Sequence, residues 1–146
     1  MGESLSLLSQ IKEQFACEPV DVRTYSPLTL AFIGDCVFDL IIRTVVVERG
    51  NRAANGLHKT KSAVVKAQTQ AEMIEALLPE LTPEEESVYR RGRNAKSYTT
   101  AKNASVGDYR KATGFEALIG YLYLQDDMDR VLYLVKKGLQ EKGLEI

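Results

Sequence analysis

The sequence predicts an all-α domain of about six or seven helices, and three observations support this. Apolar residues recur at helical spacing through most of the chain. Proline and glycine stand where helices are expected to begin or end. No segment alternates as a strand would, and the β-branched run 45–47 continues a helical register. The 146 residues, 45% of them hydrophobic, suffice for one domain with a single core.

The first elements are expected to be a short amphipathic helix and a long apolar one. Leucine, isoleucine and phenylalanine at helical spacing predict the short helix over residues 5–15, and residues 19–25 form a break. Ser26 and Pro27 supply an N-cap and a first-turn proline, so the long helix should run to about Glu48. Because it is apolar on nearly all sides, this helix is expected to be central.

The remaining elements are expected to be helices separated by polar connections. Residues 82–85 form a capping box with proline at the first helical position. The elements in order are a short helix or turn over 52–60, a helix over 62–78, a helix from 82 to about 91, a loop over 92–106, and helices over 108–125 and 127–142.

The organisation is expected to be one domain over residues 1–146. Its parts are an N-terminal helix and linker (1–24), a segment carrying two unusual acids (25–126) and a C-terminal helix (127–146). Nothing reads as a signal peptide or a membrane span. Cys17 and Cys36 make no disulfide framework, and Cys36 is expected to be buried, so a cytoplasmic location is predicted.

Basic residues are concentrated in two segments of a chain whose net charge is −1. Residues 52–66 hold four basic residues and no acid, and residues 90–111 hold seven against one acid. Such asymmetry predicts a basic surface on an otherwise acidic body, suited to a phosphate-rich partner. The alternative is two solvated basic loops.

Two acids, Asp35 and Glu116, stand inside apolar helical segments. Ionised acids are costly to bury unless they are paired or bind a cation. Gly34 and Gly120 suggest that the two helices cross closely, which would bring both carboxylates within reach of one Mg²⁺. A metal site of this kind favours hydrolysis of a phosphate ester. The alternative is that each acid pairs separately within the core.

Two motifs resemble the ribonuclease III family. Residues 30–41, LAFIGDCVFDLI, look like its signature helix, and residues 115–124, FEALIGYLYL, resemble its second acidic helix. Residues 91–96 and 109–120 are similar to the Mini-III subfamily. Together the matches reach across most of residues 26–126.

The resemblance implies a homodimeric, Mg²⁺-dependent endoribonuclease that cuts double-stranded RNA and leaves 5′-phosphate and 3′-hydroxyl ends. In Mini-III the implied substrate is the precursor of 23S ribosomal RNA. Asp35 and Glu116 match the catalytic, metal-binding acids. Thr113 replaces a family aspartate and would hold a metal-bound water, while Ala31 replaces a glutamate. Asp39 also matches a family acid, and a structural role is expected for it.

Ribonuclease III proper carries a separate RNA-binding domain, whereas this sequence ends about twenty residues beyond Asp126. The nuclease domain is therefore expected to grip RNA itself, or a partner such as a ribosomal protein would present it. His58 is expected to be a surface residue. The expected RNA-binding residues are Lys59, Lys61, Lys66, Arg90, Arg91, Arg93, Asn94 and Lys96.

Two other functions remain open at this point. Because Ala31 and Thr113 stand where the family has acids, the site has fewer acidic residues than is usual in the family. This favours a catalytically inactive RNA- or ribosome-binding module of the same fold. An all-α nucleotide pyrophosphohydrolase also uses acids on helices with Mg²⁺, but it needs clustered pairs of acids about one turn apart, which Asp35 and Asp39 fit poorly.

Overall fold

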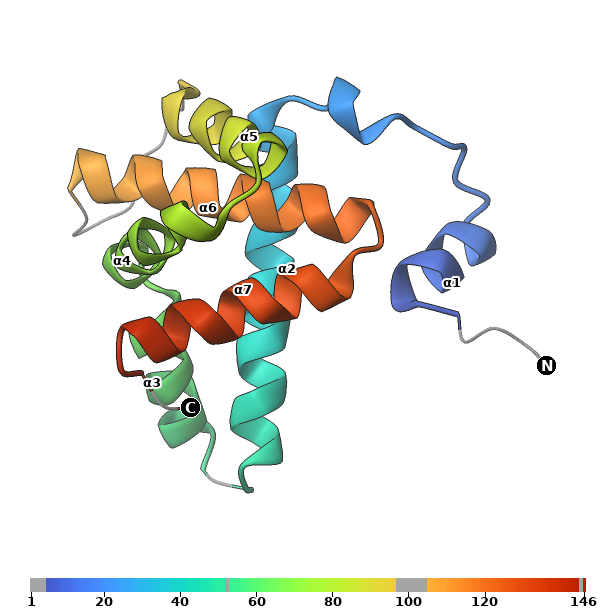
Figure 1. Ribbon diagram of the computed structural model, residues 1–146. Helices are drawn as coiled ribbons and strands as arrows, with labels where there is room; N and C mark the ends of the chain where they lie inside the picture. Colours follow the sequence, from blue (N-terminus) through green and yellow to red (C-terminus); the bar gives the residue numbers. More distant parts are fainter. Residues whose placement is uncertain (1–4, 52, 97–104, 145) are drawn as a thin grey trace.

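The computed structural model describes residues 5–51, 53–96, 105–144 and 146, and all regular structure within them is helical (Figure 1). The predicted all-α class is confirmed. The α-helices are α1 (Leu7–Gln14), α2 (Pro27–Glu48), α3 (Ala54–Val65), α4 (Ala67–Leu77), α5 (Pro83–Asn94), α6 (Val106–Leu124) and α7 (Met128–Glu141), with short 3-10 turns η1 (Val22–Thr24) and η2 (Leu78–Glu80).

The predicted helix starts follow from local capping chemistry. The Ser26 side chain accepts a hydrogen bond from the Thr29 amide at the start of α2, where Pro27 is the first helical residue. The capping box of α5 is complete, because Thr82 and Glu85 each accept from the other's backbone amide. These signals act within one turn, which is why the sequence alone reveals them.

The single helix predicted over residues 62–78 is wrong, because α3 and α4 are separate helices. Lys66 between them is extended, with φ −68° and ψ 153°. Residues 54–60 of the segment predicted as a short helix or turn belong to α3, and residue 52 lies outside the described residues. No proline or glycine marks this elbow, which instead lets α3 pack on α2 while α4 packs on α6. Residues 97–104 of the predicted loop lie outside the described residues.

The central helix is α6 rather than α2. It packs against α2, α4, α5 and α7, and Phe115, Leu118 and Ile119 are fully buried. One face of α2 is buried in the same core, but its opposite face is open, and Phe32 is 81% exposed. Cys36 is exposed there as well, so its predicted burial is wrong. An exposed apolar helix face of this kind indicates a surface that binds another protein chain.

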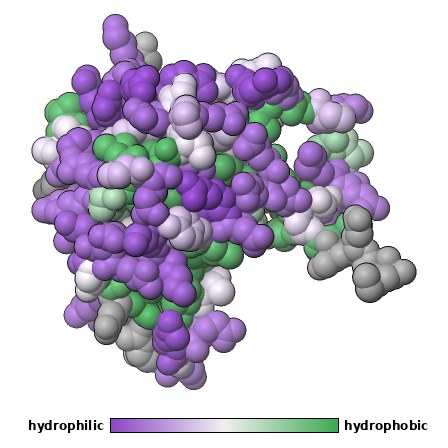
Figure 2. Space-filling view, in the orientation of Figure 1, coloured by the Kyte–Doolittle hydropathy of each residue, from purple (hydrophilic) through white to green (hydrophobic). Residues whose placement is uncertain are grey.

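Hydrophilic side chains cover most of the face shown in Figure 2, with hydrophobic patches between them. Within the described residues, every helix is too short or too polar to cross a bilayer.

The crossing of α2 and α6 is close enough that two glycines are required. A Cβ atom on Gly34 would lie 1.7 Å from the backbone oxygen of Glu116, and one on Gly120 would lie 2.0 Å from the backbone oxygen of Leu30. Backbone atoms cannot move aside as flexible side chains do. The close crossing predicted from these glycines is therefore present, and it sets Asp35 beside Glu116.

Substituting Gly34 by alanine is expected to destabilise the fold by at least about 2 kcal/mol, because the added methyl group overlaps the α6 backbone. Gly56 in α3 provides a matched control, since a Cβ atom there would meet nothing within 4 Å. Gly56→Ala should be neutral or slightly stabilising. Urea unfolding of both variants measures the difference, and equal stabilities would contradict the close crossing.

Candidate active site

Asp35 and Glu116 lie together in one hollow on the surface. The hollow, about 640 Å³ in volume, is lined from α2 and α6. Asp35 is exposed, whereas Glu116 is more deeply set. Their side chains face each other within hydrogen-bonding reach. The lining residues are Leu28, Ala31, Phe32, Ile33, Asp35, Cys36, Tyr109, Thr113 and Glu116.

The electrostatics of the pair favour a shared proton in the absence of a cation. Burial raises the pKa of Glu116, and its hydrogen bond with Asp35 and the repulsion from that carboxylate raise it further, to about 9. At neutral pH the carboxyl group of Glu116 therefore keeps its proton and donates it in a hydrogen bond to Asp35. A bound cation would displace this proton.

Thr113 contributes a hydroxyl group to the same hollow. It is 8% exposed and stands almost one helical turn before Glu116. Its Oγ1 donates to the backbone oxygen of Tyr109 at 2.9 Å, so its donor proton is committed. The lone pairs of the hydroxyl oxygen remain available to accept from a water molecule in the hollow.

The donor set fits a small hard cation that keeps several waters. It consists of the oxygens of Asp35, Glu116 and Thr113. The described residues contain no group of three or more histidine, cysteine or acidic side chains able to enclose a metal ion. Mg²⁺ is commonly held by one or two carboxylates together with substrate phosphates, whereas an all-protein cage is typical of other metals.

Asp39 lies outside the lining of this hollow and contacts basic residues instead. Its Oδ2 accepts from Arg43 Nε at 2.8 Å, and its Oδ1 lies 3.4 Å from Lys61 Nζ. That buried Oδ1 has no hydrogen-bond partner, so Lys61 supplies charge rather than a well-aligned hydrogen bond. The contact with Lys61 joins α2 to α3, whereas the contact with Arg43 lies within α2, and both suit the structural role expected of Asp39.

The predicted RNA-binding residues fall into two groups that the fold does not bring together. Lys59 and Lys61 belong to α3 and Lys66 follows it, whereas the others lie on α5 or directly after it. Figure 1 shows α3 and α5 toward opposite ends of α2. Within one chain these residues therefore form two basic surfaces rather than one.

Several of these basic groups have partners within the protein. Arg90 pairs with Glu86 at 2.8 Å, and the guanidinium of Arg93 lies 5.7 Å from the ring centre of Tyr89. Arg93 also donates to Asn94 Oδ1 at 3.3 Å. The side chain of Lys61 is only 17% exposed because it contacts Asp39. The exposed members of the predicted set are Lys59, Lys66, Arg90, Arg91, Asn94 and Lys96.

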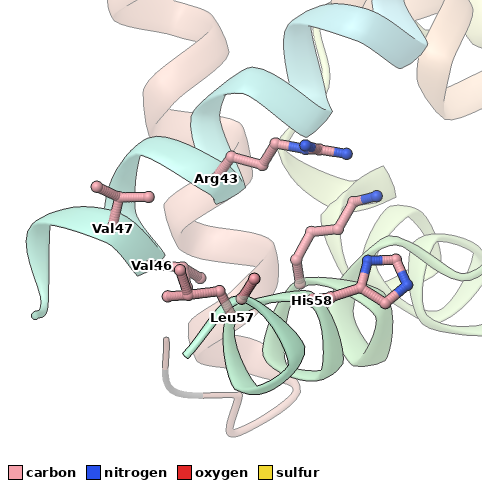
Figure 3. Close-up of a pocket in the computed structure, with 7 residues that line it drawn as sticks. Arg43, Val46, Val47, Leu57 and His58 are labelled. Atoms are coloured by element: carbon pink, nitrogen blue, oxygen red, sulfur yellow. The ribbon is translucent and has the colours of Figure 1, made fainter. Parts of the chain in front are cut away.

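His58 is exposed and borders a different pocket of about 350 Å³. Figure 3 shows Arg43, Val46 and Val47 of α2 and Leu57 and His58 of α3 among the side chains that line it. This pocket shares no lining residue with the hollow of Asp35 and Glu116. His58 therefore does not line the hollow that holds the two acids.

Comparison with known proteins identifies the family. The model of the ribonuclease III domain matches residues 28–127. The chain belongs to the ribonuclease III family. The Mini-ribonuclease 3 of Thermoanaerobacter sp. (strain X514) is 48% identical over 119 residues, covering 82% of this chain and 84% of that protein. The Mini-ribonuclease 3 of Enterococcus faecalis is 42% identical over 125 residues, covering 84% and 95%.

A solved structure shares this fold. The crystal structure of protein FN1578 from Fusobacterium nucleatum superimposes with a TM-score of 0.76 at 29% identity, covering 85% of this chain and 99% of that one. The resemblance to Mini-III within the ribonuclease III family is thus confirmed, and the chain is an endoribonuclease.

One residue that contacts Glu116, Gln70, was not among the predicted site residues. Gln70 of α4 is 2% exposed, and its side-chain amide makes a hydrogen bond to Glu116 that opposes the rise in the pKa of Glu116. A signal was present, because Gln70 precedes Ile74 and Leu77 by four and seven residues and so falls on an apolar stripe. A polar residue on such a stripe indicates a buried hydrogen-bond partner.

Proposed function

We propose that this enzyme is a Mg²⁺-dependent, double-strand-specific endoribonuclease that works as a homodimer on the precursor of 23S ribosomal RNA in the cytoplasm. The observation that carries the proposal is the convergence of Asp35 and Glu116, from two separate helices, in one open hollow. The substrate is proposed from the Mini-ribonuclease 3 relatives.

Asp35 and Glu116 would hold the Mg²⁺, and Thr113 would orient a water molecule through its hydroxyl oxygen. When bound, Mg²⁺ supplies Lewis-acid activation of water and offsets negative charge on the phosphate. The paired acids supply the negative potential that attracts the cation. Hydrolysis with departure of the 3′ oxygen yields the 5′-phosphate and 3′-hydroxyl ends.

The two basic surfaces suit a long, rod-shaped partner better than a small ligand. Lys59 lies on α3 and Lys66 directly follows it, whereas Arg91 lies on α5 and Lys96 lies just beyond it. These two helices lie toward opposite ends of α2 (Figure 1). An A-form duplex presents phosphates and 2′-hydroxyl groups along its whole length. Binding by these cations should weaken as salt concentration rises.

The open face of α2 supports the proposed homodimer. Leu28, Phe32 and Leu40 are 39%, 81% and 50% exposed and lie along one side of that helix. Large exposed apolar side chains of this kind commonly mark a protein interface. Light scattering should give about twice the chain mass of 16.3 kDa. A monomeric mass at micromolar concentration would contradict the dimer.

The decisive experiment is incubation of the purified protein with precursor ribosomal RNA and Mg²⁺, followed by mapping of the new ends. Cleavage in the paired region near the 23S ends, lost when EDTA is added, supports the proposal. RNA binding without cleavage would instead support the non-catalytic module that Ala31 and Thr113 suggest.

Adding ribosomal protein to the same reaction tests whether a partner assists cleavage. Release of pyrophosphate from a nucleotide would support the pyrophosphohydrolase. That function would use Asp35 and Asp39 as its pair of acids, but Asp39 already contacts Arg43 and Lys61.

A further inference from the structure

We propose that Gln70 is a positioning residue of this site: it donates a hydrogen bond to Glu116 and holds that carboxylate in line with Asp35 for a divalent cation. The inference rests on the proposed function of Asp35 and Glu116 as metal ligands. It assigns to α4 a part in a site whose other members lie on α2 and α6.

The burial of Gln70 requires a partner for its amide. The side chain is 2% exposed, and a buried amide without a hydrogen bond is costly. Its bond goes to Glu116. Another buried polar side chain, Glu85, serves the fold directly, since it closes the cap of α5. Gln70 instead joins α4 to the acid on α6.

A neutral donor is the group this position needs. Asp35 and Glu116 already repel each other, and a third acid would increase that repulsion. A carboxylate has about four lone-pair positions, so one bond from Gln70 leaves the others free for a cation. Carboxylates that bind metals are usually held by such hydrogen bonds, which fix their orientation.

The elbow at Lys66 places Gln70 at the site. The backbone N–H of Gln70 donates to the Lys66 backbone oxygen at 3.1 Å, so the residue lies in the first turns of α4. Farther along this helix, Ile74 and Leu77 are fully buried, and Met73 packs against Gly138 of α7. Gln70 therefore stands on a helix whose position is fixed by core packing, as a positioning residue must.

The test measures binding of Mn²⁺, as a spectroscopic substitute for Mg²⁺, to the protein without RNA. Gln70→Met keeps the length and volume of the side chain but removes the donor. Electron paramagnetic resonance should show Mn²⁺ binding about tenfold weaker than in the wild type. At saturating metal the cleavage rate should remain within about threefold of the wild type. Gln140→Met, at an exposed position on α7, is the control and should bind normally.

A second variant covers the case in which Gln70→Met does not fold. Gln70→Asn keeps the amide but is one methylene too short to reach Glu116, and the same loss of affinity is expected. Mn²⁺ binding equal to the wild type in either folded variant would overturn the role of Gln70 alone. If the wild type bound no Mn²⁺, or Asp35→Asn bound it equally well, the proposed function itself would fail and this inference with it.

Discussion

Replacing Asp35 by asparagine is expected to slow RNA cleavage by at least about 10³-fold, because the variant would lose a proposed metal ligand, and the described residues offer no further cluster of acids to replace it. Binding of duplex RNA should remain within about threefold, since the cationic side chains proposed to contact phosphates are unchanged. Single-turnover cleavage and a filter-binding assay at fixed salt concentration measure the two quantities separately.

The matched control is Asp129→Asn, an exposed acid in the first turn of α7. It should cleave at the wild-type rate. Full activity in Asp35→Asn would remove the metal assignment. A parallel loss of RNA binding would show that Asp35 supports the RNA-binding surface, and it would count against a purely catalytic role.

Glu116→Gln is expected to abolish cleavage to a similar extent and, unusually, to stabilise the metal-free protein. In the wild type Glu116 holds a proton between two acids at neutral pH. In the variant the new amide can donate permanently to Asp35, while its oxygen accepts from Gln70. The melting temperature at pH 8 should rise by about 3 °C, which corresponds to about 1 kcal/mol in a domain of this size.

The pH dependence of stability tests the same point. The folded-state pKa of Glu116, about 9, lies above its ordinary value of 4.5. Unfolding therefore releases a proton between these pH values, and the wild type loses stability as pH rises through this window. Glu116→Gln lacks this loss. The difference in melting temperature between variant and wild type should be small near pH 4.5 and grow steadily toward pH 9.

Thermal unfolding from pH 5 to 9 in EDTA gives this difference directly. The control variant Glu13→Gln replaces an exposed acid on α1. Its difference in melting temperature from the wild type should be the same at each pH. Added Mg²⁺ should stabilise the wild type more than Glu116→Gln, because the variant lacks one of the two proposed ligands. A pH-independent difference would mean that Glu116 is ionised in the folded protein.

Much of the site could be predicted from sequence because two of its signals are local. Gly34 beside Asp35, and Glu116 four residues before Gly120, indicate a close crossing with an acid next to it. The caps at Ser26 and Thr82 likewise act within one turn. Such features depend on the near neighbours of each residue in the chain, so the printed order of residues contains them.

Other features depend on which helix faces which. The exposure of Phe32 and Cys36 could not be predicted from the sequence. A helix that is buried on all sides and a helix with one apolar face exposed on the surface can have the same composition. The separation of Lys59 from Arg91 was hidden for the same reason, since charge along a sequence does not say which end of the fold each segment reaches.

The sequence by itself determined the helical class, the start of each well-capped helix and the two acids of the site, because periodicity, caps and local packing glycines act over a few residues. Only the tertiary structure decided that the helix is interrupted at Lys66, although the amphipathic pattern continues through it. Only the tertiary structure likewise placed Gln70 of α4 within hydrogen-bonding distance of Glu116. The reason is physical: that elbow is stabilised by the packing of α3 on α2 and of α4 on α6, contacts between residues far apart in the chain.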